Sequence, residues 1–481
     1  MLAAGALAAS GLAVFVPAAH AQAQDTATIN GATRYQTITG FGASEAFGQA
    51  QAVMNAPAAV QRQALDLLYS RTKGAGLDIL RNEISADPGG TIEPNAPSSP
   101  SATPTYIPMS QTSQDLGQLW LAQTIKRDYG VTNVFADAWS APGFMKDNNT
   151  QIGAGTLCGA PGVTCPSGDW RQAYANYLVQ YAKDYAEAGV PLSYVGPVNE
   201  PTWNAVFYDG MLMTPAQLAN FMDVLGPTLA KSWSGTGGTK AECCASIGWD
   251  AAQQDAAAIE ADPVANHYTP LFTSHGYSAA PNSPLTGWTK QVWETEWTTF
   301  NGTFDPQWDG GNDSGMAWAQ NIYNGLVNAN LNAFLFWWGI GDSSIVANDC
   351  CLVAINEPPA GSTASPTVSA SGRLWAFAQY SRFIRPGAVR IGATSSNSAV
   401  EISAYKNIDG TVAIVALNTA TSAEPISYSL SGTGTPDHGA VIPYLSDSSH
   451  DVAVQPAIPV SGGSFSATIP ARSLVTYVIR P

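Results

Sequence analysis

The sequence is poor in charged residues and has no excess of basic ones. Lys and Arg number 20, and Asp and Glu number 36, among 481 residues, which gives a formal net charge of −16. Nucleic acids and anionic membrane surfaces bind basic proteins, so this balance argues against either partner. Hydrophobic residues make up 45% of the chain, enough for a large core, and the length suits one barrel-sized unit with an appended domain.

Metal-binding motifs are missing as well. The sequence contains no CxxC pair and no HExxH motif, and its five histidines are scattered, so we expect neither a metal nor a cofactor. Cysteine is scarce, with six residues, and the even number fits an oxidising compartment. Sequence cannot resolve the pairing, but Cys158 and Cys165 are the preferred pair because they close a small Gly/Pro-rich loop.

The first residues have the character of an export signal. Residues 1–24 are Ala-rich and apolar and end in the small-x-small pattern Ala19-His20-Ala21, which predicts a cleaved signal peptide and a secreted protein. The usual positive start is missing, because no Lys or Arg precedes Arg34. A transmembrane anchor is the alternative, although the apolar run through Pro17 is short for a membrane span.

Strand-like and helical patterns alternate along most of the chain. Strands are expected at Gly40–Ser44, Leu77–Glu83, Asn133–Ser140, Ser193–Glu200, Glu242–Asp250, Phe272–Ser278, Gln291–Trp297 and Ala333–Gly339. Helical spacing is found between them, for example at Ala58–Arg71, at Asp169–Ala188 after an Asp cap, and at Thr214–Ser232 after Thr-Pro. Eight such alternations predict an α/β protein with a (β/α)8 TIM barrel.

Long connections fall on one side of these strands. The Pro/Gly/Ser/Asn-rich stretches at 86–113, 141–168, 298–314 and 340–372 all follow a predicted strand, whereas the helix-to-strand connections are short. Insertions therefore collect on the C-terminal face of the barrel, where barrel enzymes build their active sites.

The end of the chain has a different pattern. From about Pro386 it alternates β-prone runs with Gly, Ser and Asp turns, which predicts an associated side β-sandwich domain. We divide the chain into a signal peptide (1–24), an N-terminal strand region that joins the side domain (25–39), the barrel (40–384) and the side domain (385–481).

Two carboxylates end separate predicted strands. Glu200 ends the fourth and Glu296 lies near the end of the seventh. Either residue alone is equally well explained as a solvated loop residue or a salt-bridge partner. Together they predict retaining glycoside hydrolysis, which needs an acid and a nucleophile about 5–5.5 Å apart. Pro201 disfavours helical geometry at Glu200 and predicts an extended backbone there.

The seventh strand carries two candidates for the nucleophile. Glu294 and Glu296 share a face because side chains alternate along a strand. Glu296 is nearer the C-terminal mouth, so we expect it to be the nucleophile, with Glu294 a buried structural acid.

Several polar residues are expected near this pair. Asn199 could bond the sugar's 2-hydroxyl. Arg81 could bond the nucleophile and favour its ionised form, or instead pair with Glu83 or Asp137. Tyr277 is a candidate donor to the nucleophile, with a His275–Tyr277 core pair as the alternative.

Aromatic residues gather at the same strand ends. They can stack on sugar rings or pack the barrel top, and they are Trp139, Trp203, Trp297, Trp337 and Trp338.

Six ordered motifs resemble glycoside hydrolase family 30. They are Gly40-Phe-Gly-Ala-Ser-Glu-Ala-Phe47, Trp139-Ser-Ala-Pro-Gly-Phe-Met-Lys146, Val198-Asn-Glu-Pro201, Glu294-Thr-Glu-Trp297, Phe336-Trp-Trp-Gly339 and Ile469-Pro-Ala-Arg-Ser-Leu474. The resemblance implies a barrel with a side β domain and a retaining mechanism, with Glu200 as acid/base and Glu296 as nucleophile. The residues expected to contact substrate are Asn199, Trp139, Ser140, Tyr277, Trp297, Trp338, Arg81 and Gln49.

The segment from Leu157 to Tyr174, together with Cys243-Cys244, is similar to subfamily 7, whose members cleave xylan. In some of those relatives an Arg after the first motif reads a glucuronic acid branch, and Gln49 stands at the corresponding position here. A neutral amide cannot make the bidentate contact of Arg. Strict dependence on the acid branch is therefore not expected.

The sequence thus predicts a secreted, monomeric, retaining glycoside hydrolase that cleaves the polysaccharide β-1,4-xylan, as a xylanase, glucuronoxylanase or xylobiohydrolase. A β-1,6-glucanase or β-1,6-galactanase is the alternative on the same fold. A non-catalytic carbohydrate-binding protein is the alternative from another class. An esterase is disfavoured because Gly42-Ala-Ser-Glu-Ala46 lacks the final Gly of GxSxG.

Overall fold

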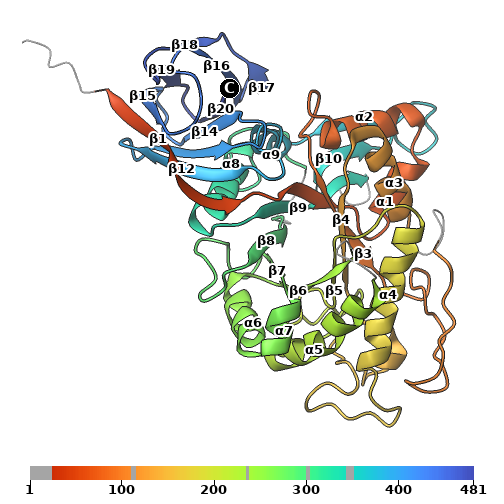
Figure 1. The fold of residues 1–481 in the computed structure, drawn as a ribbon. Helices are drawn as coiled ribbons and strands as arrows, with labels where there is room; N and C mark the ends of the chain where they lie inside the picture. Colours follow the sequence, from red (N-terminus) through yellow and green to blue (C-terminus); the bar gives the residue numbers. More distant parts are fainter. Residues whose placement is uncertain (1–23, 110–114, 234–237, 300–303, 343–350) are drawn as a thin grey trace, which may run out of the picture.

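The computed structural model describes residues 24–109, 115–233, 238–299, 304–342 and 351–481. A barrel surrounded by helices forms the larger part, and a β domain containing the C-terminus packs beside it (Figure 1). The expected signal peptide lies outside the described residues. In the described part of the chain, every helix is too short or too polar to cross a membrane.

Eight parallel strands close the barrel, and all eight expected strands are present. Each strand pairs with the next, and β9 pairs with both β8 and β2. The strands are β2 Gly40–Ser44, β3 Ile79–Ile84, β4 Asn133–Ala138, β5 Tyr194–Gly196, β6 Lys240–Ser246, β7 Leu271–His275, β8 Gln291–Glu296 and β9 Ala333–Asp342. The prediction of a (β/α)8-type barrel is confirmed.

Helices cover the outside of the barrel. They are α1 Gln49–Asn55, α2 Ala58–Tyr69, α3 Gln118–Tyr129, α4 Arg171–Glu187, α5 Pro215–Ser232, α6 Trp249–Ala261, α7 Pro263–Tyr268, α8 Gly315–Tyr323 and α9 Gly372–Ser381, with short turns at Gly143–Met145 and Asn324–Asn328. Thr214 caps α5 in a reciprocal box with Gln217. The expected Asp cap of α4 is shifted, because Trp170 precedes the helix and Asp169 accepts from the backbone N–H of Arg171.

Two expectations about the connections are wrong. Residues 276–290, between β7 and β8, form no helix, since two prolines and two glycines interrupt this stretch. The stretch 340–372, expected to be irregular, contains β10 Cys351–Asn356 and β11 Thr367–Ala370. β10 runs parallel to β9 and is almost completely buried, because its apolar residues extend the barrel sheet.

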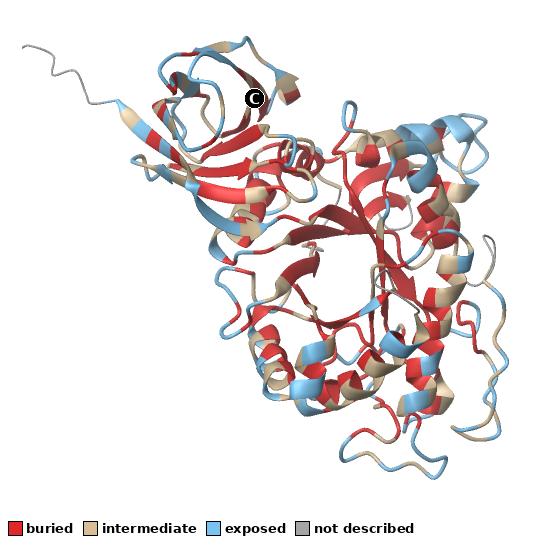
Figure 2. Cartoon of the chain, viewed as in Figure 1, coloured by how far each residue is buried: buried red, intermediate tan, exposed pale blue. Residues whose placement is uncertain are grey.

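The side domain has its own core. Its strands are β1 Asp25–Thr37, β12 Val389–Ser395, β13 Val400–Lys406, β14 Val412–Asn418, β15 Glu424–Ser431, β16 Gly439–Asp447, β17 His450–Val454, β18 Ile458–Val460, β19 Ser464–Ile469 and β20 Ser473–Ile479. β1 pairs with β12 and β15, so the start of the described chain belongs to this sheet. Buried residues line the inner faces of both parts (Figure 2).

Arg472 makes some of the contacts that fix the side domain to the barrel. Arg472 donates to both carboxylate oxygens of Asp309 at 2.9 and 2.6 Å, and the indole of Trp308 donates to the Arg472 carbonyl at 2.8 Å. Asp309 and Trp308 belong to the loop after β8, so this loop touches the second domain.

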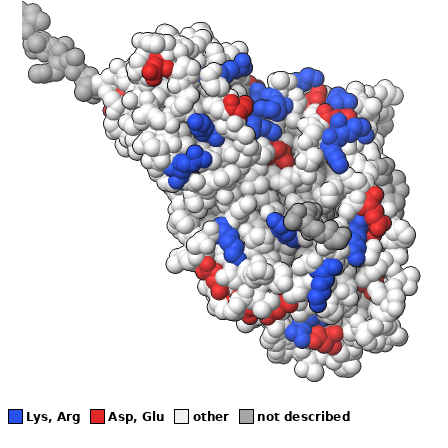
Figure 3. All heavy atoms as spheres, viewed as in Figure 1, with Lys and Arg blue, Asp and Glu red and all other residues white. Residues whose placement is uncertain are grey.

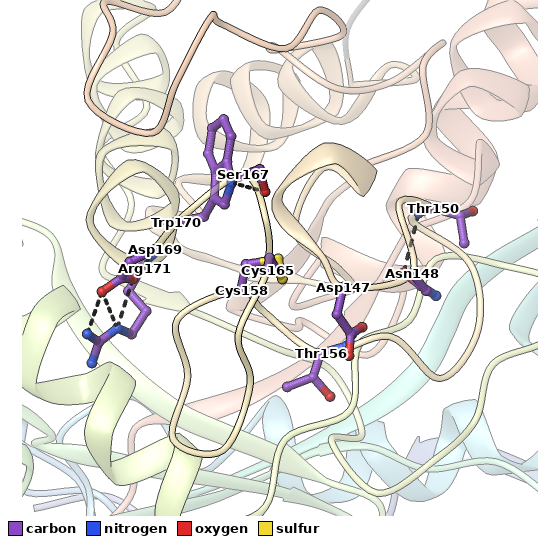
Figure 4. The surroundings of a disulfide bond; sticks show 10 residues. All are labelled: Asp147, Asn148, Thr150, Thr156, Cys158, Cys165, Ser167, Asp169, Trp170 and Arg171. Atoms are coloured by element: carbon purple, nitrogen blue, oxygen red, sulfur yellow. Dashed lines mark hydrogen bonds and ion pairs between the residues drawn. A yellow bond between two sulfur atoms is a disulfide. The ribbon is translucent and has the colours of Figure 1, made fainter.

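The expected disulfide between Cys158 and Cys165 is present, with the two Cα atoms 5.6 Å apart. It closes a loop between β4 and α4 (Figure 4). In the same loop the indole N–H of Trp170 donates to Ser167. A second disulfide joins the neighbouring residues Cys243 and Cys244 in β6.

Candidate active site

A cavity of about 500 Å³ opens where the barrel strands end. Residues from seven strands or the turns after them contribute to its wall: Phe47, Trp139, Asn199, Glu200, Trp203, Tyr208, Ile247, Tyr277, Glu296, Trp337 and Trp338. Most of these side chains are aromatic, and among them only Glu200 and Glu296 carry carboxyl groups. The cavity therefore offers flat apolar surfaces around an acidic centre.

Glu200 lies just beyond β5 and is 7% exposed. Its backbone N–H donates to the carbonyl of Ala245 at 2.9 Å. The backbone φ of Glu200 is 49°, in the left-handed region, so the expected extended geometry before Pro201 is wrong. A non-glycine residue in this region is strained, and such strain gathers at functional sites. The tie to β6 holds Glu200 in this conformation.

Glu296 is the last residue of β8 and is 5% exposed. The Tyr277 hydroxyl donates to its Oε1 at 2.9 Å, and the Arg81 guanidinium donates to its Oε2. Burial is the largest influence and leaves the pKa of Glu296 above its ordinary value, whereas the charge of Arg81 and the bonds from Arg81 and Tyr277 oppose this rise. These donors favour the carboxylate form.

Glu200 has the opposite surroundings. Burial, followed by the negative charge of Glu296, raises the pKa of Glu200 well above its ordinary value, and Arg81 only partly opposes this. The environment therefore holds Glu200 protonated next to an ionised Glu296. Two carboxyl groups with separated pKa values can serve as an acid and a base or nucleophile.

Arg81 organises the polar side of the site. This fully buried residue of β3 donates to Asp137 at 2.6 Å, to the Asn199 side-chain oxygen at 2.6 Å, and to Glu296. Its guanidinium lies over the Trp139 ring, 4.6 Å from the centroid. Arg81 therefore contacts both Glu296 and Asp137, two of the partners expected for it.

His275 joins the two carboxylates and was not among the expected site residues. Its Nδ1 lies 3.0 Å from Glu200 Oε1, and its Nε2 lies 3.6 Å from Glu296 Oε2. Burial and the nearby Arg81 lower the pKa of His275 well below its ordinary value, so the ring is neutral. Its place at the end of β7 was visible in the sequence, but its partners were not.

Other buried acids lie below the cavity. Glu294 is fully buried, and its carboxylate accepts from the backbone N–H of Glu296 at 3.0 Å. Burial raises the pKa of Glu294 well above its ordinary value. Glu242, another fully buried acid, accepts from Thr273. Neither residue lines the cavity, and Glu294 lies deeper in the barrel because it precedes Glu296 by two residues on β8.

The aromatic wall includes residues that sequence reasoning missed. Phe47 packs edge-on against Trp139, Tyr208, Trp337 and Trp338. Trp337 and Trp338 stack with their ring centroids 4.8 Å apart. Phe47 ends the first of the six motifs, but a position after a strand end does not by itself show that a phenylalanine lines the cavity.

Four expected contact residues lie outside the cavity wall. Ser140 is buried and accepts from Lys146 at 3.1 Å. Gln49, on α1, accepts from the backbone N–H of Asp342 at 3.3 Å. Trp297 packs against Trp318 and Phe334, because it points outward from the strand end that carries Glu296. Asn199, Trp139, Tyr277 and Trp338 do line the wall, while Arg81 lies behind it.

Within the described ranges, one group of three residues has atoms placed for a metal. Oxygen or nitrogen atoms of Glu200, His275 and Glu296 all lie within 4.8 Å of one another. The guanidinium of Arg81, however, is bonded to Glu296 and repels a cation. The arrangement therefore favours acid–base chemistry between the carboxyl groups over metal coordination.

Two family models match this chain. The model described as O-Glycosyl hydrolase family 30 matches residues 24–281, and that described as Glycosyl hydrolase family 30 beta sandwich domain matches residues 387–477. Among solved structures, the catalytic domain of GH30 xylanase C from Talaromyces cellulolyticus is 42% identical, covers 95% of this chain and 100% of that chain, and has a TM-score of 0.85.

Curated relatives are more distant. Putative glucosylceramidase 4 from Caenorhabditis elegans is 25% identical over 60% of this chain and 56% of that protein. Glucuronoxylanase XynC from Bacillus subtilis (strain 168) is 25% identical over 64% of this chain and 66% of that protein. The matched regions therefore span less than two thirds of the length of these two relatives.

Proposed function

Because the chain belongs to glycoside hydrolase family 30, we propose that it is a secreted retaining β-1,4-xylanase with Glu200 as acid/base and Glu296 as nucleophile. The observation that carries this proposal is the pair of carboxyl groups with unequal surroundings. Their nearest oxygens lie within 4.8 Å, which fits the separation of about 5–5.5 Å between carboxyl groups in retaining enzymes better than the wider inverting one.

The proposed reaction has two steps. The carboxylate of Glu296 attacks the anomeric carbon while Glu200 donates its proton to the leaving oxygen, and a glycosyl-enzyme forms. Glu200, now ionised, then takes a proton from water, which displaces Glu296 from the sugar. Arg81 and Tyr277 hold the nucleophile, each on a different oxygen. Burial raises the pKa of Glu200, so this residue keeps the proton that it donates.

Asn199 is proposed to bind the sugar beside the nucleophile. Its side-chain oxygen accepts from Arg81, which fixes the orientation of the amide. The NH2 group is then the end that can donate to a hydroxyl in the cavity. Trp139, Trp337 and Trp338 supply ring faces on which a pyranose can stack.

Xylan is the proposed polymer. Support comes from the likeness to the Talaromyces xylanase over almost the whole chain and from the likeness to the Bacillus glucuronoxylanase. Gln49 lies on α1, outside the cavity wall, and its side chain is bonded to the backbone of Asp342. We therefore propose cleavage of the main chain without a required glucuronic acid branch.

Product chromatography tests this proposal on linear xylo-oligosaccharide, glucuronic-acid-branched xylan and β-1,6-glucan in parallel. Cleavage of both xylan substrates is expected. Cleavage of the branched polymer alone would mean that a residue other than Gln49 recognises the branch. Cleavage of β-1,6-glucan alone would show that the substrate is this glucan and not xylan. Glu296→Gln tests for a non-catalytic binding protein, which would keep its function. Mass spectrometry of the exported protein's N-terminus tests secretion.

A further inference from the structure

A second large cavity lies between the barrel and the side domain. It has a volume of about 740 Å³ and draws residues from the ends of α2 and α9, from the turn between β13 and β14, and from β16 and β20. Four arginines line it: Arg71, Arg382, Arg385 and Arg480. They enter from the end of the barrel opposite the catalytic cavity, since Arg71, Arg382 and Arg385 follow outer helices rather than strands.

Two of these arginines are fixed by backbone carbonyls. Arg385 donates from Nη1 to the carbonyls of Gly76 and Ser381 at 2.8 and 2.6 Å. Arg382 donates from Nε to the carbonyl of Gly74. Asn407, in the side domain, accepts from the backbone N–H of Arg385 and donates to the Phe383 carbonyl. Both domains therefore hold this cationic wall in place.

The other two arginines have no such partner. Throughout the described residues, neither the Arg71 nor the Arg480 guanidinium makes a hydrogen bond or ion pair. Both side chains are exposed to solvent at the cavity. Each guanidinium therefore keeps its full set of donors for an external ligand.

Acidic neighbours neutralise only part of this charge. Asp409 lines the cavity, but its side chain accepts from the backbone N–H of Thr411. Asp78 lies 3.2 Å from Arg385 and interacts electrostatically with Arg71 as well, and burial raises the pKa of Asp78 to about 7. Asp451 interacts electrostatically with Arg382. Basic side chains also gather near the junction of the side domain with the barrel in Figure 3. Four of the 20 basic residues of a chain with a net charge of −16 thus meet in one place.

We propose that this cavity binds an oxyanion, with Arg71 and Arg480 as its free donors. Arginine forks match carboxylate, phosphate and sulfate oxygens. The rings of Phe383 and Tyr444, whose centroids lie 4.5 Å apart, add an aromatic wall of the kind on which a sugar ring packs. The same chemistry suits a uronic acid unit of a polysaccharide or a free inorganic anion. The site goes beyond the proposed hydrolase function and does not depend on it.

Isothermal titration of the full chain with sodium glucuronate, inorganic phosphate and glucose tests the site. Arg71→Gln/Arg480→Gln should weaken binding of the anions by about tenfold or more, since two charged donors are lost. The matched control is Arg62→Gln/Arg127→Gln, which removes the same charge from exposed arginines on α2 and α3 and should leave binding unchanged.

The three ligands distinguish the sources of the anion. Tighter binding of glucuronate than of phosphate, with none of glucose, would identify an acidic sugar. Comparable binding of phosphate would identify a site for free oxyanions. The proposal would be wrong if the unmodified protein bound none of these anions, or if the two double variants bound them equally. Xylan cleavage should be the same in both double variants. A failure of the anion-site proposal can therefore be distinguished from a failure of the hydrolase proposal.

Discussion

At the scale of single residues, the site depends on donors that distinguish two similar carboxyl groups. Tyr277 and Arg81 both donate to Glu296, whereas Glu200 has the neutral His275 as its polar neighbour. In the proposed mechanism, the difference between the acid and the nucleophile therefore lies in these three supporting side chains. Removing one of the donors to Glu296 should therefore change the pKa of Glu296 without disturbing the fold.

Tyr277→Phe tests this shift. The bond from the Tyr277 hydroxyl lowers the pKa of Glu296, so its loss should raise that pKa. Because Glu296 must be ionised to attack, the acidic limb of the kcat/KM profile should move to higher pH by the same amount. The control is Tyr208→Phe, from the same cavity wall, which should leave the limb in place. An unmoved acidic limb in Tyr277→Phe would contradict the proposed role of the hydroxyl.

The choice between Glu296 and Glu294 can be settled by trapping the intermediate. A 2-deoxy-2-fluoro xyloside should label Glu296, identified by mass spectrometry of the labelled peptide, because Glu294 is fully buried with a strongly raised pKa and lies outside the cavity. Glu296→Gln should lower kcat on the order of 10⁴-fold or more. Glu294→Gln can still accept from the Glu296 backbone, so it should cost far less. A label on Glu294 would reverse the two roles.

The ends of the fourth and seventh barrel strands, where the two carboxyl groups lie, could be predicted from the sequence because strand period and strand order are encoded locally. It could not give side-chain direction beyond a strand end. Trp297 follows Glu296 directly yet packs outward against Trp318, and Gln49 bonds a backbone group instead of lining the cavity. Tertiary packing determines the direction of these two side chains. His275 was likewise visible as a strand-end residue, but its place between two acids needed the closed barrel.

At the scale of elements, all eight barrel strands were predictable, because a buried parallel strand is a short apolar run with a recognisable end. The connections between the strands were less predictable. The stretch from Cys351 to Asn356 reads as part of a long loop until β9 supplies the edge on which it pairs. Residues 276–290 were assigned to the regular alternation, although their prolines and glycines exclude a helix.

The loop closed by Cys158 and Cys165 gives a prediction for one element. Replacing both residues by Ser should cost about 2.5 kcal/mol of stability, the chain-entropy value for so short a loop. Neither cysteine lines the catalytic cavity, so kcat should stay nearly unchanged. Urea unfolding and xylan kinetics measure the two effects. Ser167→Ala, which removes only the bond from Trp170, should cost about 1 kcal/mol. A large loss of kcat in the double variant would show that this loop shapes the site.

At the scale of the whole molecule, buried acids should make the protein more stable in acid than in alkali. Burial raises the pKa of Asp78 to about 7, of Glu83 to about 8 and of Asp255 to about 6, from ordinary values of 3.8 to 4.5. Each group keeps its proton in the folded state over a range where the unfolded chain has lost it. Their contribution to stability is therefore complete below about pH 4 and is lost as pH rises toward 8.

Glu83 allows this prediction to be tested with one substitution. Its carboxylate accepts from the Phe47 backbone N–H at 2.8 Å, a bond that the amide oxygen of Gln can replace. Glu83→Gln should therefore reduce the loss of stability between pH 5 and pH 8 by on the order of 3 kcal/mol, at about 1.4 kcal/mol per pKa unit. Urea midpoints at both pH values measure this change. Glu187→Gln, on an exposed residue of α4, should leave the pH dependence as it is. If stability instead rises with pH in the unmodified protein, then the buried carboxyls are ionised in the folded state, and the ion pair between Asp78 and Arg385 outweighs the cost of their burial.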